Sequence, residues 1–199
     1  MVARQRSYFA VRLNPKEKII GLNDATVSDF WAWAYSDILT TTTRGMFAEF
    51  LVGSALGVTE NMPPAGWGDF DLLYEDKKIE VKASAYIQSW NQRTFSNIRF
   101  DIGERGTWDE ANSTWLEEST RSADCYVFCL FAEKDRGAAN VIDATTWDFY
   151  VVSTHRINEA FKNQKIVGLR GIANSTEPAK IDQLRERTDL AMRDHSTPG

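Results

Sequence analysis

The stretch 67–84, which reads WGDFDLLYEDKKIEVKAS, most strongly constrains how this chain can fold. Residues 70–74 are mostly apolar strand formers, residues 75–78 form a polar turn, and residues 79–83 alternate between apolar and charged. Such alternation has the period of a strand with one face buried and the other face exposed. The stretch therefore predicts a tight antiparallel β-hairpin.

The pairing in this hairpin follows from the length of its loop. A two-residue loop at Asp76 and Lys77 places Asp71 opposite Lys82, and a four-residue loop over the polar turn gives the same register. Residues opposite each other share one face of a sheet, whereas a slip by one residue would turn the whole set over. We therefore expect the apolar side chains to enter a core and the charged side chains to project to the other face. The charged set comprises Asp69, Asp71, Glu80 and Lys82.

This charged face has two interpretations. Charged residues on one face of an antiparallel hairpin commonly do no more than meet solvent. However, two carboxylates on adjacent strands are also the hard oxygen ligands that Mg²⁺ prefers. A lysine two residues further along the same face can orient a water molecule or stabilise developing negative charge. A metal ion in such a site polarises a phosphoryl oxygen and generates a nucleophile from water.

A helix before the hairpin carries one further acidic candidate. Residues 43–56 are expected to be helical, with Gly57 ending the helix. Glu49 lies at the border of the expected buried stripe, with Gly45 and Gly53 one turn away on either side, so that a strand or a phosphate could approach it closely. The alternative is a surface glutamate that only supports the helix. The expected stripe comprises Met46, Phe47, Phe50, Leu51 and Leu56.

Asp71 before an apolar run, followed after a short turn by Glu-Val-Lys at 80–82, resembles the motif of the PD-(D/E)xK nuclease superfamily. In that family an acidic residue opens one strand, and the next strand carries Glu or Asp, any residue and Lys. A glutamate on the preceding helix often completes the site, and Glu49 occupies the matching position here. The resemblance covers about residues 44–90 well and the remainder only through the order of elements.

The resemblance implies a Mg²⁺-dependent DNA endonuclease that hydrolyses phosphodiester bonds, with Mn²⁺ as a possible substitute for Mg²⁺. It implies that Asp71 and Glu80, with the Val81 carbonyl, hold the metal. By the same resemblance Lys82 positions the attacking water, and Glu49 binds or orients a second metal or its water.

Three further residues are candidates for the site. Asp69 rivals Asp71 for the aspartate role, and Asp71 is preferred because it opens the apolar run and is expected to face Lys82. Family members often place a polar residue just beyond the lysine. Ser84 or Gln88 is therefore expected to contact the substrate or a metal-bound water.

The whole chain has the length and composition of a globular protein. Its 199 residues are 43% hydrophobic and 26% charged, which is enough for a sizeable core. We expect a single domain over residues 1–199, with its core at about 26–170 and a peripheral C-terminal helix at 177–193. The expected fold class is α/β, with a mixed central β-sheet flanked by helices, and the resemblance makes this a restriction-endonuclease-like core.

Several other elements can be placed along the chain. A helix capped by Ser28 is expected to run to about Leu39. Residues 124–132 are apolar on both faces, which is typical of a central strand covered by layers on both sides. Residues 95–102 and 148–153 are expected to be further strands. The polar, acidic and turn-rich residues 103–121 are expected to form a mobile insertion or a recognition loop.

The charge and cysteine content bear on partners and location. The net charge of −5 is not typical of a non-specific DNA binder; it counts against a nuclease but does not exclude one with a local basic track. Arg93, Arg99 and Arg105 are candidates for phosphate contacts. No run approaches the roughly 20 apolar residues of a membrane helix, and the first residues lack the apolar segment of a secretion signal. Cys125 and Cys129 are interpreted as buried free thiols of a cytoplasmic protein.

Two other functions are compatible with these residues. One is a catalytically inactive nucleic-acid-binding or structural protein on the same fold, although the complete set of four site residues argues against it. The other is a glycosidase that uses Asp71 and Glu80 as acid and base, which predicts no metal and leaves Lys82 without a role. A homodimer is also possible, because cutting both strands of a duplex favours two copies.

Overall fold

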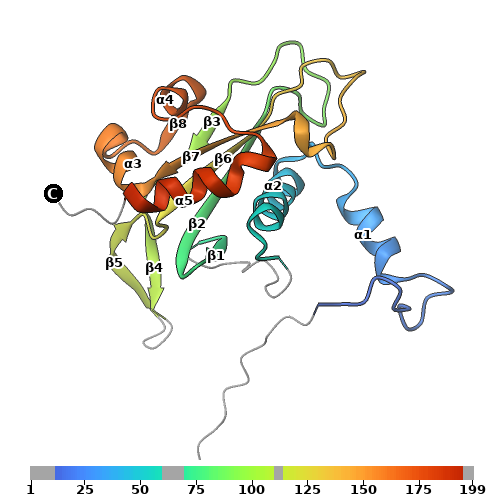
Figure 1. The fold of residues 1–199 in the computed structure, drawn as a ribbon. Helices are drawn as coiled ribbons and strands as arrows, with labels where there is room; N and C mark the ends of the chain where they lie inside the picture. Colours follow the sequence, from blue (N-terminus) through green and yellow to red (C-terminus); the bar gives the residue numbers. More distant parts are fainter. Residues whose placement is uncertain (1–11, 60–69, 110–113, 195–199) are drawn as a thin grey trace, which may run out of the picture. The chain divides into compact units, whose positions relative to one another are not determined.

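The computed structural model describes residues 12–59, 70–109 and 114–194 (Figure 1). Its internal contacts divide the chain into two compact units, Met1–Asp37 and Ile38–Gly199. The single domain expected from the sequence remains a prediction. Within the described residues, no helix combines the length and the apolar character that a bilayer span requires.

The first unit contains helix α1 (Val27–Tyr35). Thr26, and not Ser28 as expected, caps this helix. The Thr26 hydroxyl accepts a hydrogen bond from the Asp29 amide at 3.4 Å, and the Asp29 carboxylate accepts one from the Thr26 amide at 2.7 Å. This reciprocal pair satisfies two amides that the first helical turn leaves without partners, which explains why the helix begins at Val27.

The second unit is built on a four-stranded mixed sheet in the order β1-β2-β6-β7 (Figure 1). Its strands are β1 (Leu72–Tyr74), β2 (Lys77–Ala85), β6 (Cys125–Phe131) and β7 (Trp147–Ser153). β1 pairs antiparallel with β2, β2 pairs parallel with β6, and β6 pairs antiparallel with β7. The expected α/β class with a mixed central sheet is therefore confirmed, as is the central position of β6, whose residues are all buried.

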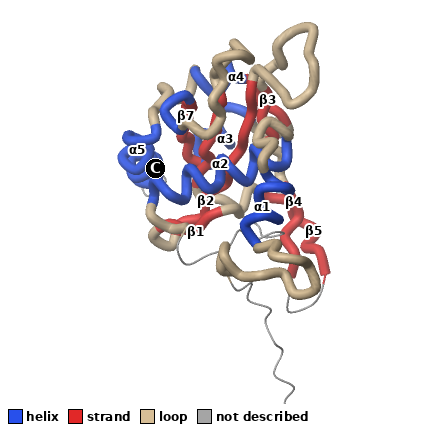
Figure 2. Tube along the Cα trace, turned by 90° about the vertical axis from the view of Figure 1, so that its right-hand side faces the viewer, coloured by secondary structure: helices blue, strands red, loops and turns tan. Residues whose placement is uncertain are grey.

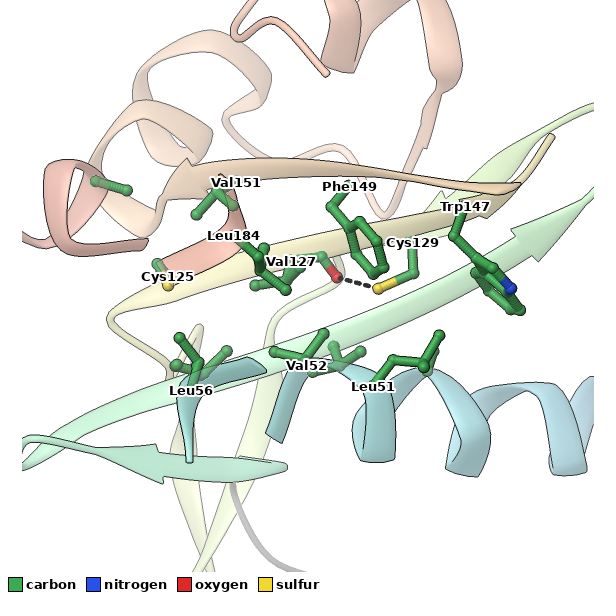
Figure 3. Packing of buried hydrophobic residues seen from close by; sticks show 14 of the residues in the cluster. Leu51, Val52, Leu56, Cys125, Val127, Cys129, Trp147, Phe149, Val151 and Leu184 are labelled. Carbon is green, nitrogen blue, oxygen red and sulfur yellow. Dashed lines mark hydrogen bonds between the residues drawn. The ribbon is translucent and has the colours of Figure 1, made fainter. Parts of the chain in front are cut away.

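Helices α2 (Thr41–Leu56) and α5 (Leu184–Asp194) cover one face of this sheet, as Figures 1 and 2 show from two sides. Figure 3 shows apolar side chains of α2 facing those of β6 and β7. Cys125 and Cys129 lie among them as free thiols, as expected. The C-terminal helix expected to be peripheral begins later, at Leu184, and buries Leu184, Ala191 and Met192 in this cluster.

The opposite face of the sheet packs against a second cluster. It is formed by strands β3 (Arg99–Asp101) and β8 (Ile166–Gly168), which pair antiparallel, and by helices α3 (Thr154–Phe161) and α4 (Leu169–Ala173). A single-turn 3₁₀ helix, η1 (Ala144–Thr146), leads into β7, and another, η2 (Ile181–Gln183), leads into α5. β3 is shorter than the strand expected at 95–102.

Residues 103–121, expected to be an irregular insertion, instead contain two strands. β4 (Arg105–Asp109) and β5 (Thr114–Thr120) form an antiparallel ribbon in which Trp108 is the Cα partner of Trp115. The polar composition of this segment had indicated a loop and not strands. Threonine and tryptophan are strong strand formers, and a hairpin can pair them locally without a strongly apolar face.

The β1–β2 hairpin lies where the sequence places it, but its register differs by two residues from the expected one. Leu72 pairs with Ile79, and the loop consists of Glu75 and Asp76, with φ angles of 48° and 62°. Two-residue loops with left-handed φ angles match the twist of the strands that they join. Lys77 therefore belongs to β2 and not to the loop.

This register changes the partner of the expected metal ligand. Continued by one residue, it places Asp71 opposite Glu80, whereas we expected Asp71 opposite Lys82. Because the shift is by an even number of residues, the faces of the hairpin are unchanged. The apolar side chains Ile79 and Val81 are buried, as expected, in the α2 cluster, which is the set of apolar side chains between the sheet and helices α2 and α5.

The buried face of α2 is rotated from the expected stripe. Met46 and Phe50 are 44% and 52% exposed, so their placement in the core was wrong. Ala48 and Val52, which lie one turn apart, are fully buried instead, because small side chains allow the helix to pack closely on the sheet. Gly57 ends the helix with a left-handed φ of 77°, as predicted.

Candidate functional site

β2 presents Glu80 and Lys82 on the face opposite the α2 cluster, next to Tyr126 and Phe128 of β6, their Cα partners. Glu80 is only 7% exposed. The Lys82 ammonium forms an ion pair with Glu80 Oε1, and Arg105 Nη1 lies 3.8 Å from the same oxygen. A buried carboxylate of this kind is stabilised by the cations around it.

Asp71 is fixed beside these residues by the backbone of β2. Its amide donates to the Ile79 carbonyl at 3.0 Å, and its Oδ2 accepts from the Val81 amide at 2.7 Å. β1 begins only at Leu72, so the carboxylate supplies the acceptor that a longer partner strand would have given Val81. Because β1 does not extend to Asp71, the Asp71 carboxylate is held in place by the Val81 amide.

Glu49 lies on α2 and is close enough to Asp71, Glu80 and Lys82 to interact with them electrostatically. Burial and the negative charges of Asp71 and Glu80 raise the pKa of Glu49 to about 7, and the positive charge of Lys82 opposes this rise. The pKa of Asp71 is raised as well, first by burial and then by Glu80, against the Val81 hydrogen bond and the charge of Lys82. These mutual effects show that the structure brings together the four side chains singled out in the sequence.

Gly45 and Gly53, the small residues on either side of Glu49, have different surroundings. A Cβ added to Gly53 would lie 2.7 Å from Thr59 Cγ2, so this glycine is needed for the close packing of α2 against its surroundings. A Cβ added to Gly45 would meet no atom of the described residues within 4 Å. The surface of α2 is therefore open on the N-terminal side of Glu49.

A small hollow opens on the side of the sheet that bears Glu80 and Lys82. Arg121 forms one wall, because its guanidinium donates to the Ile102 carbonyl and to Asn158 Oδ1, each at 2.7 Å. The residues that line the hollow are Glu80, Lys82, Asp101, Gly103, Arg105, Thr120, Arg121, Ser122, Ala123 and Tyr126.

Arg121 and Tyr126 are site residues that sequence reasoning missed. Burial and the charge of Glu80 raise the pKa of Tyr126 to about 12, so its phenol stays protonated. Nothing local in the sequence identifies either residue. Tyr126 reaches the site only because β6 pairs parallel with β2, and such long-range pairing leaves no mark in the local pattern.

The three secondary candidates have different outcomes. Both polar atoms of the Gln88 side chain are engaged inside the protein, since Oε1 accepts from Arg44 Nη1 and Nε2 donates to the Ala85 carbonyl, each at 2.9 Å. Gln88 therefore ties α2 to the end of β2. Ser84 is buried on β2, and Asp69 lies outside the described residues.

The oxygen donors at this point suit a hard divalent cation. Among the described residues, no three histidine, cysteine or acidic side chains are grouped as a ready metal cage. However, Mg²⁺ usually keeps several waters and takes only one or two carboxylates from the protein. Asp71 and Glu80 raise the pKa of Glu49 by repulsion, which a bound cation would relieve. The donor set therefore fits Mg²⁺ with water completing its coordination.

Comparison of the chain with protein-family models and with curated proteins gives no match. The chemistry of the site is therefore the basis for inferring a function.

Proposed function

We propose that this chain is a metal-dependent nuclease that hydrolyses phosphodiester bonds in DNA, on a restriction-endonuclease-like core of the PD-(D/E)xK superfamily. The observation that carries the proposal is the convergence of Glu49, Asp71, Glu80 and Lys82 where β1 ends. The element order supports it, because a helix with a glutamate precedes a hairpin with the acidic pair and the lysine.

Asp71 and Glu80 are the side chains that would hold Mg²⁺, or Mn²⁺ in its place, with the Val81 carbonyl as a third donor. A divalent cation supplies polarisation of a phosphoryl oxygen and a water of lowered pKa. The hydrogen bond from the Val81 amide leaves the Asp71 carboxylate with free acceptor capacity and a fixed orientation. This preorganisation is what a ligand of a catalytic cation requires.

Lys82 and Glu49 are proposed to act on the attacking water. The Lys82 ammonium is partly exposed and lies beside the hollow, so a change of rotamer can carry it from Glu80 to a water or a phosphoryl oxygen. There it would stabilise the negative charge that develops during displacement. Glu49, which ionises at a pH of about 7, would orient the water or a second cation.

The surroundings of the hollow are suited to a nucleic acid. Arg105 lines the hollow, and Arg93 and Arg99 are exposed. Arginines position nucleic acids through their phosphates. Since the net charge of the chain is −5, this attraction has to be local. We expect two copies of the chain to act together on a duplex if both strands are cut.

One observation favours a second candidate function. Lys82 and Arg105 already neutralise Glu80 within the protein. A catalytically inactive nucleic-acid-binding protein on the same fold would keep such an arrangement, with the basic side chains facing phosphate and no need for a metal. This alternative predicts binding of DNA without cleavage.

Nicking of a supercoiled plasmid in Mg²⁺ or in EDTA tests the proposal. The parent chain should nick the plasmid in Mg²⁺ and not in EDTA, and Lys82→Ala should remove the activity. Lys77→Ala is the matched control, because Lys77 lies on the same strand with its side chain on the other face. A parent chain that binds the plasmid but leaves it intact in both Mg²⁺ and Mn²⁺ would establish the alternative.

A further inference from the structure

The connection from β2 to β3 begins with a loop, residues 86–96, that is closed and fastened from within. The Ser96 amide donates to the Tyr86 carbonyl at 2.9 Å, which joins the two ends of the loop. Inside it, Gln92 Oε1 accepts from the Gln88 amide at 2.7 Å, and Gln92 Nε2 donates to Ser96 Oγ at 3.0 Å. These bonds satisfy polar groups within the loop and so define its backbone.

Arg136 fastens this loop to the connection between β6 and β7. Its Nη2 donates to the Gln88 carbonyl at 2.6 Å and to the Trp90 carbonyl at 2.9 Å. Figure 1 shows both connections at the end of the sheet that lies away from the β1–β2 hairpin. The backbone of Trp90 is therefore held in place, although the residue is 55% exposed.

A second ring of the loop is exposed beside a cation. Phe95 is 53% exposed and meets Tyr86 edge to face, with 6.4 Å between the ring centroids and 72° between the ring planes. Such a contact covers at most one face of either ring. Lys134 Nζ lies 4.5 Å from the centroid of Tyr86 and 6.0 Å from that of Phe95. The side chains that the loop and its neighbour present together are called the aromatic platform, and they are Tyr86, Trp90, Arg93, Phe95 and Lys134.

The aromatic platform is basic, although the chain as a whole carries a net charge of −5. Residues 84–100 include Arg93 and Arg99, both exposed, and no acidic residue. The acidic residues that flank the lysine, Glu133 and Asp135, accept hydrogen bonds from backbone amides of their own turn. Exposed rings with cations among them suit a ligand that combines flat apolar groups with negative charge. The unpaired bases and phosphates of a single-stranded nucleic acid have this combination.

The platform and the candidate active site share one face of the sheet. Tyr86 packs against the cluster on the face that bears Glu80 and Lys82. Four residues separate Lys82 from Tyr86, which is about 13 Å at the rise of a strand. From the loop the chain continues through Arg99 to Asp101, which lines the hollow, and both side chains are exposed on β3. One strand of nucleic acid can therefore contact the hollow and the loop together.

We propose that the aromatic platform binds the unpaired bases of a DNA strand next to the phosphate that is cleaved. The bases stack on Phe95 and Trp90, and their phosphates contact Arg93, Arg99 and Lys134. A continuous duplex cannot make these contacts, because its bases are stacked on one another. The preferred substrate is therefore a duplex with single-stranded arms. Binding of the single strand rests on the platform alone, whereas its part in the choice of substrate rests on the proposed function.

Fluorescence polarisation with the full chain in EDTA tests the binding without cleavage. The probes are a labelled oligothymidylate of about twelve nucleotides, within the usual site size of a single-strand binder, and the same strand paired with its complement. The single strand should bind at least tenfold more tightly than the duplex. Its affinity should fall with rising salt, because phosphates are contacted.

Phe95→Leu is the decisive variant, because it keeps an apolar side chain against Tyr86 and removes the ring on which a base stacks. It should bind the single strand at least fivefold more weakly than the parent, and Phe95→Trp should restore the affinity. Lys134→Gln should reduce the salt dependence of binding. Leu190→Ala is the matched control, because Leu190 is 54% exposed on α5, which covers the other face of the sheet, and its affinity should equal that of the parent. Melting temperatures check that each variant is folded.

Cleavage in Mg²⁺ tests the choice of substrate. The parent should cut a forked duplex, with unpaired arms of about ten nucleotides, at least tenfold faster than a continuous duplex of the same sequence. Phe95→Leu should cut the fork more slowly and the continuous duplex as the parent does. Equal rates of the parent on the two substrates would overturn the role of the platform in substrate choice.

The binding outcomes separate the platform from the proposed function. Single-strand binding that Phe95→Leu weakens supports the platform, even if no DNA is ever cut. Equal single-strand binding by Phe95→Leu and the parent, or equal binding of single strand and duplex by the parent, would overturn it even if DNA is cut. A dimer that Phe95→Leu dissociates without any change in DNA binding would assign the surface to a second copy of the chain and overturn the proposal.

Discussion

β2 and β6 are parallel neighbours in one sheet, but β2 carries the charged pair Glu80 and Lys82 whereas β6 carries only buried side chains. Every residue of β6 is buried, because helices cover one face and β3, β8 and α3 cover the other. β2 has only the three-residue β1 beyond it, and its face at 80–82 borders the hollow. Lys82 and Phe128 are Cα partners, but Lys82 pairs with Glu80 whereas Phe128 is fully buried. The charged side chains therefore lie where the layer that covers this face of the sheet ends.

The physical reason is the cost of burying charge. An unpaired ion in a dry interior is too costly to keep, whereas an ion at the border of a sheet can share cations and solvent. Glu80 has Lys82 and Arg105 beside it, and Asp71 has the Val81 amide. On β6 the same level of the sheet is occupied by aromatic rings, with Tyr126 and Phe128 stacked at 5.8 Å between ring centroids. We therefore expect mutations on β2 to affect chemistry and mutations on β6 to affect stability.

The largest effect is expected from Lys82→Met, which removes the ammonium and keeps much of the aliphatic stem. The rate of plasmid cleavage in Mg²⁺ should fall about 10³-fold, because a donor aimed at developing charge contributes about 4 kcal/mol to the transition state. The thermal stability should fall as well, because buried Glu80 would keep only Arg105 as a nearby cation, so cleavage is measured well below the melting temperature of the variant. Single-turnover kinetics with the enzyme in excess measure the chemical step, and Lys77→Met is the control on the other face of β2. Equal rates for Lys82→Met and the parent would remove Lys82 from the mechanism.

Phe128→Ala, at the partner position on β6, should lower stability and spare cleavage. Phe128 is fully buried and contacts Phe100 with 5.0 Å between ring centroids. Removing such a ring costs about 3 kcal/mol through lost burial and the cavity that remains. Urea unfolding measures this loss. Below its melting temperature the variant should keep metal-dependent cleavage within a few-fold, and a selective loss of cleavage with normal stability would erase the contrast between the strands.

Glu49 should give the cleavage rate a pH dependence. The pKa of Glu49 is raised to about 7, so the side chain is largely protonated at lower pH and cannot serve a cation or a water. Bound Mg²⁺ relieves part of the repulsion from Asp71 and Glu80, so the rate should rise with pH through a pKa below the metal-free value of about 7 and then level off. Glu49→Gln should be slower and should lose this rise. A parent and a Glu49→Gln variant with the same rate and the same pH profile would show that Glu49 does not take part.

The same pKa shift predicts a smaller effect on stability. The pKa of Glu49 is about 7 in the folded protein against a reference value of 4.5, so ionisation is more costly in the folded state than in the unfolded state. This penalty is absent below the reference pKa, grows between the two values and is complete above about pH 7. Without metal, Glu49→Gln should therefore raise the melting temperature at about pH 8 and not at about pH 4. Mg²⁺ should stabilise the parent more than the variant, and the opposite order would contradict its binding near Glu49.

Much of the fold could be predicted because its signals are local. The apolar run at 124–132 indicated a central strand, and Gly57 indicated the end of α2. Errors arose where tertiary packing decides. Met46 and Phe50 were wrongly placed in the helix stripe, whereas Phe47, Leu51 and Leu56 do pack in the core. The β4–β5 ribbon was missed because its polar composition concealed its pairing.

The candidate site was predictable to the extent that it lies on one hairpin and one helix. The face shared by Asp71, Glu80 and Lys82 follows from alternation alone and survives the shift in register. Arg121 and Tyr126 lie about 40 residues after the hairpin in the sequence, and no local pattern identifies them as site residues. The burial of Arg44 is also invisible in the sequence, since an arginine in a helix is ordinarily a surface residue.

The smallest expected effect concerns the loop that holds β1 against β2. Glu75 has a left-handed φ of 48°, which is costly for glutamate and well tolerated by asparagine. Glu75→Asn should therefore stabilise the protein by about 0.5 kcal/mol, measured as a higher urea midpoint with an unchanged slope. Cleavage should not change, because Glu75 lies outside the site.

Glu75→Val provides the opposite control. A β-branched side chain is strained at this backbone angle, so the variant should lose at least about 1 kcal/mol of stability. If Asn and Val gave the same midpoint, the loop would not have the left-handed geometry that sets the register. Asp71 would then no longer be held opposite Glu80, and the contrast between β2 and β6 would lose its structural basis.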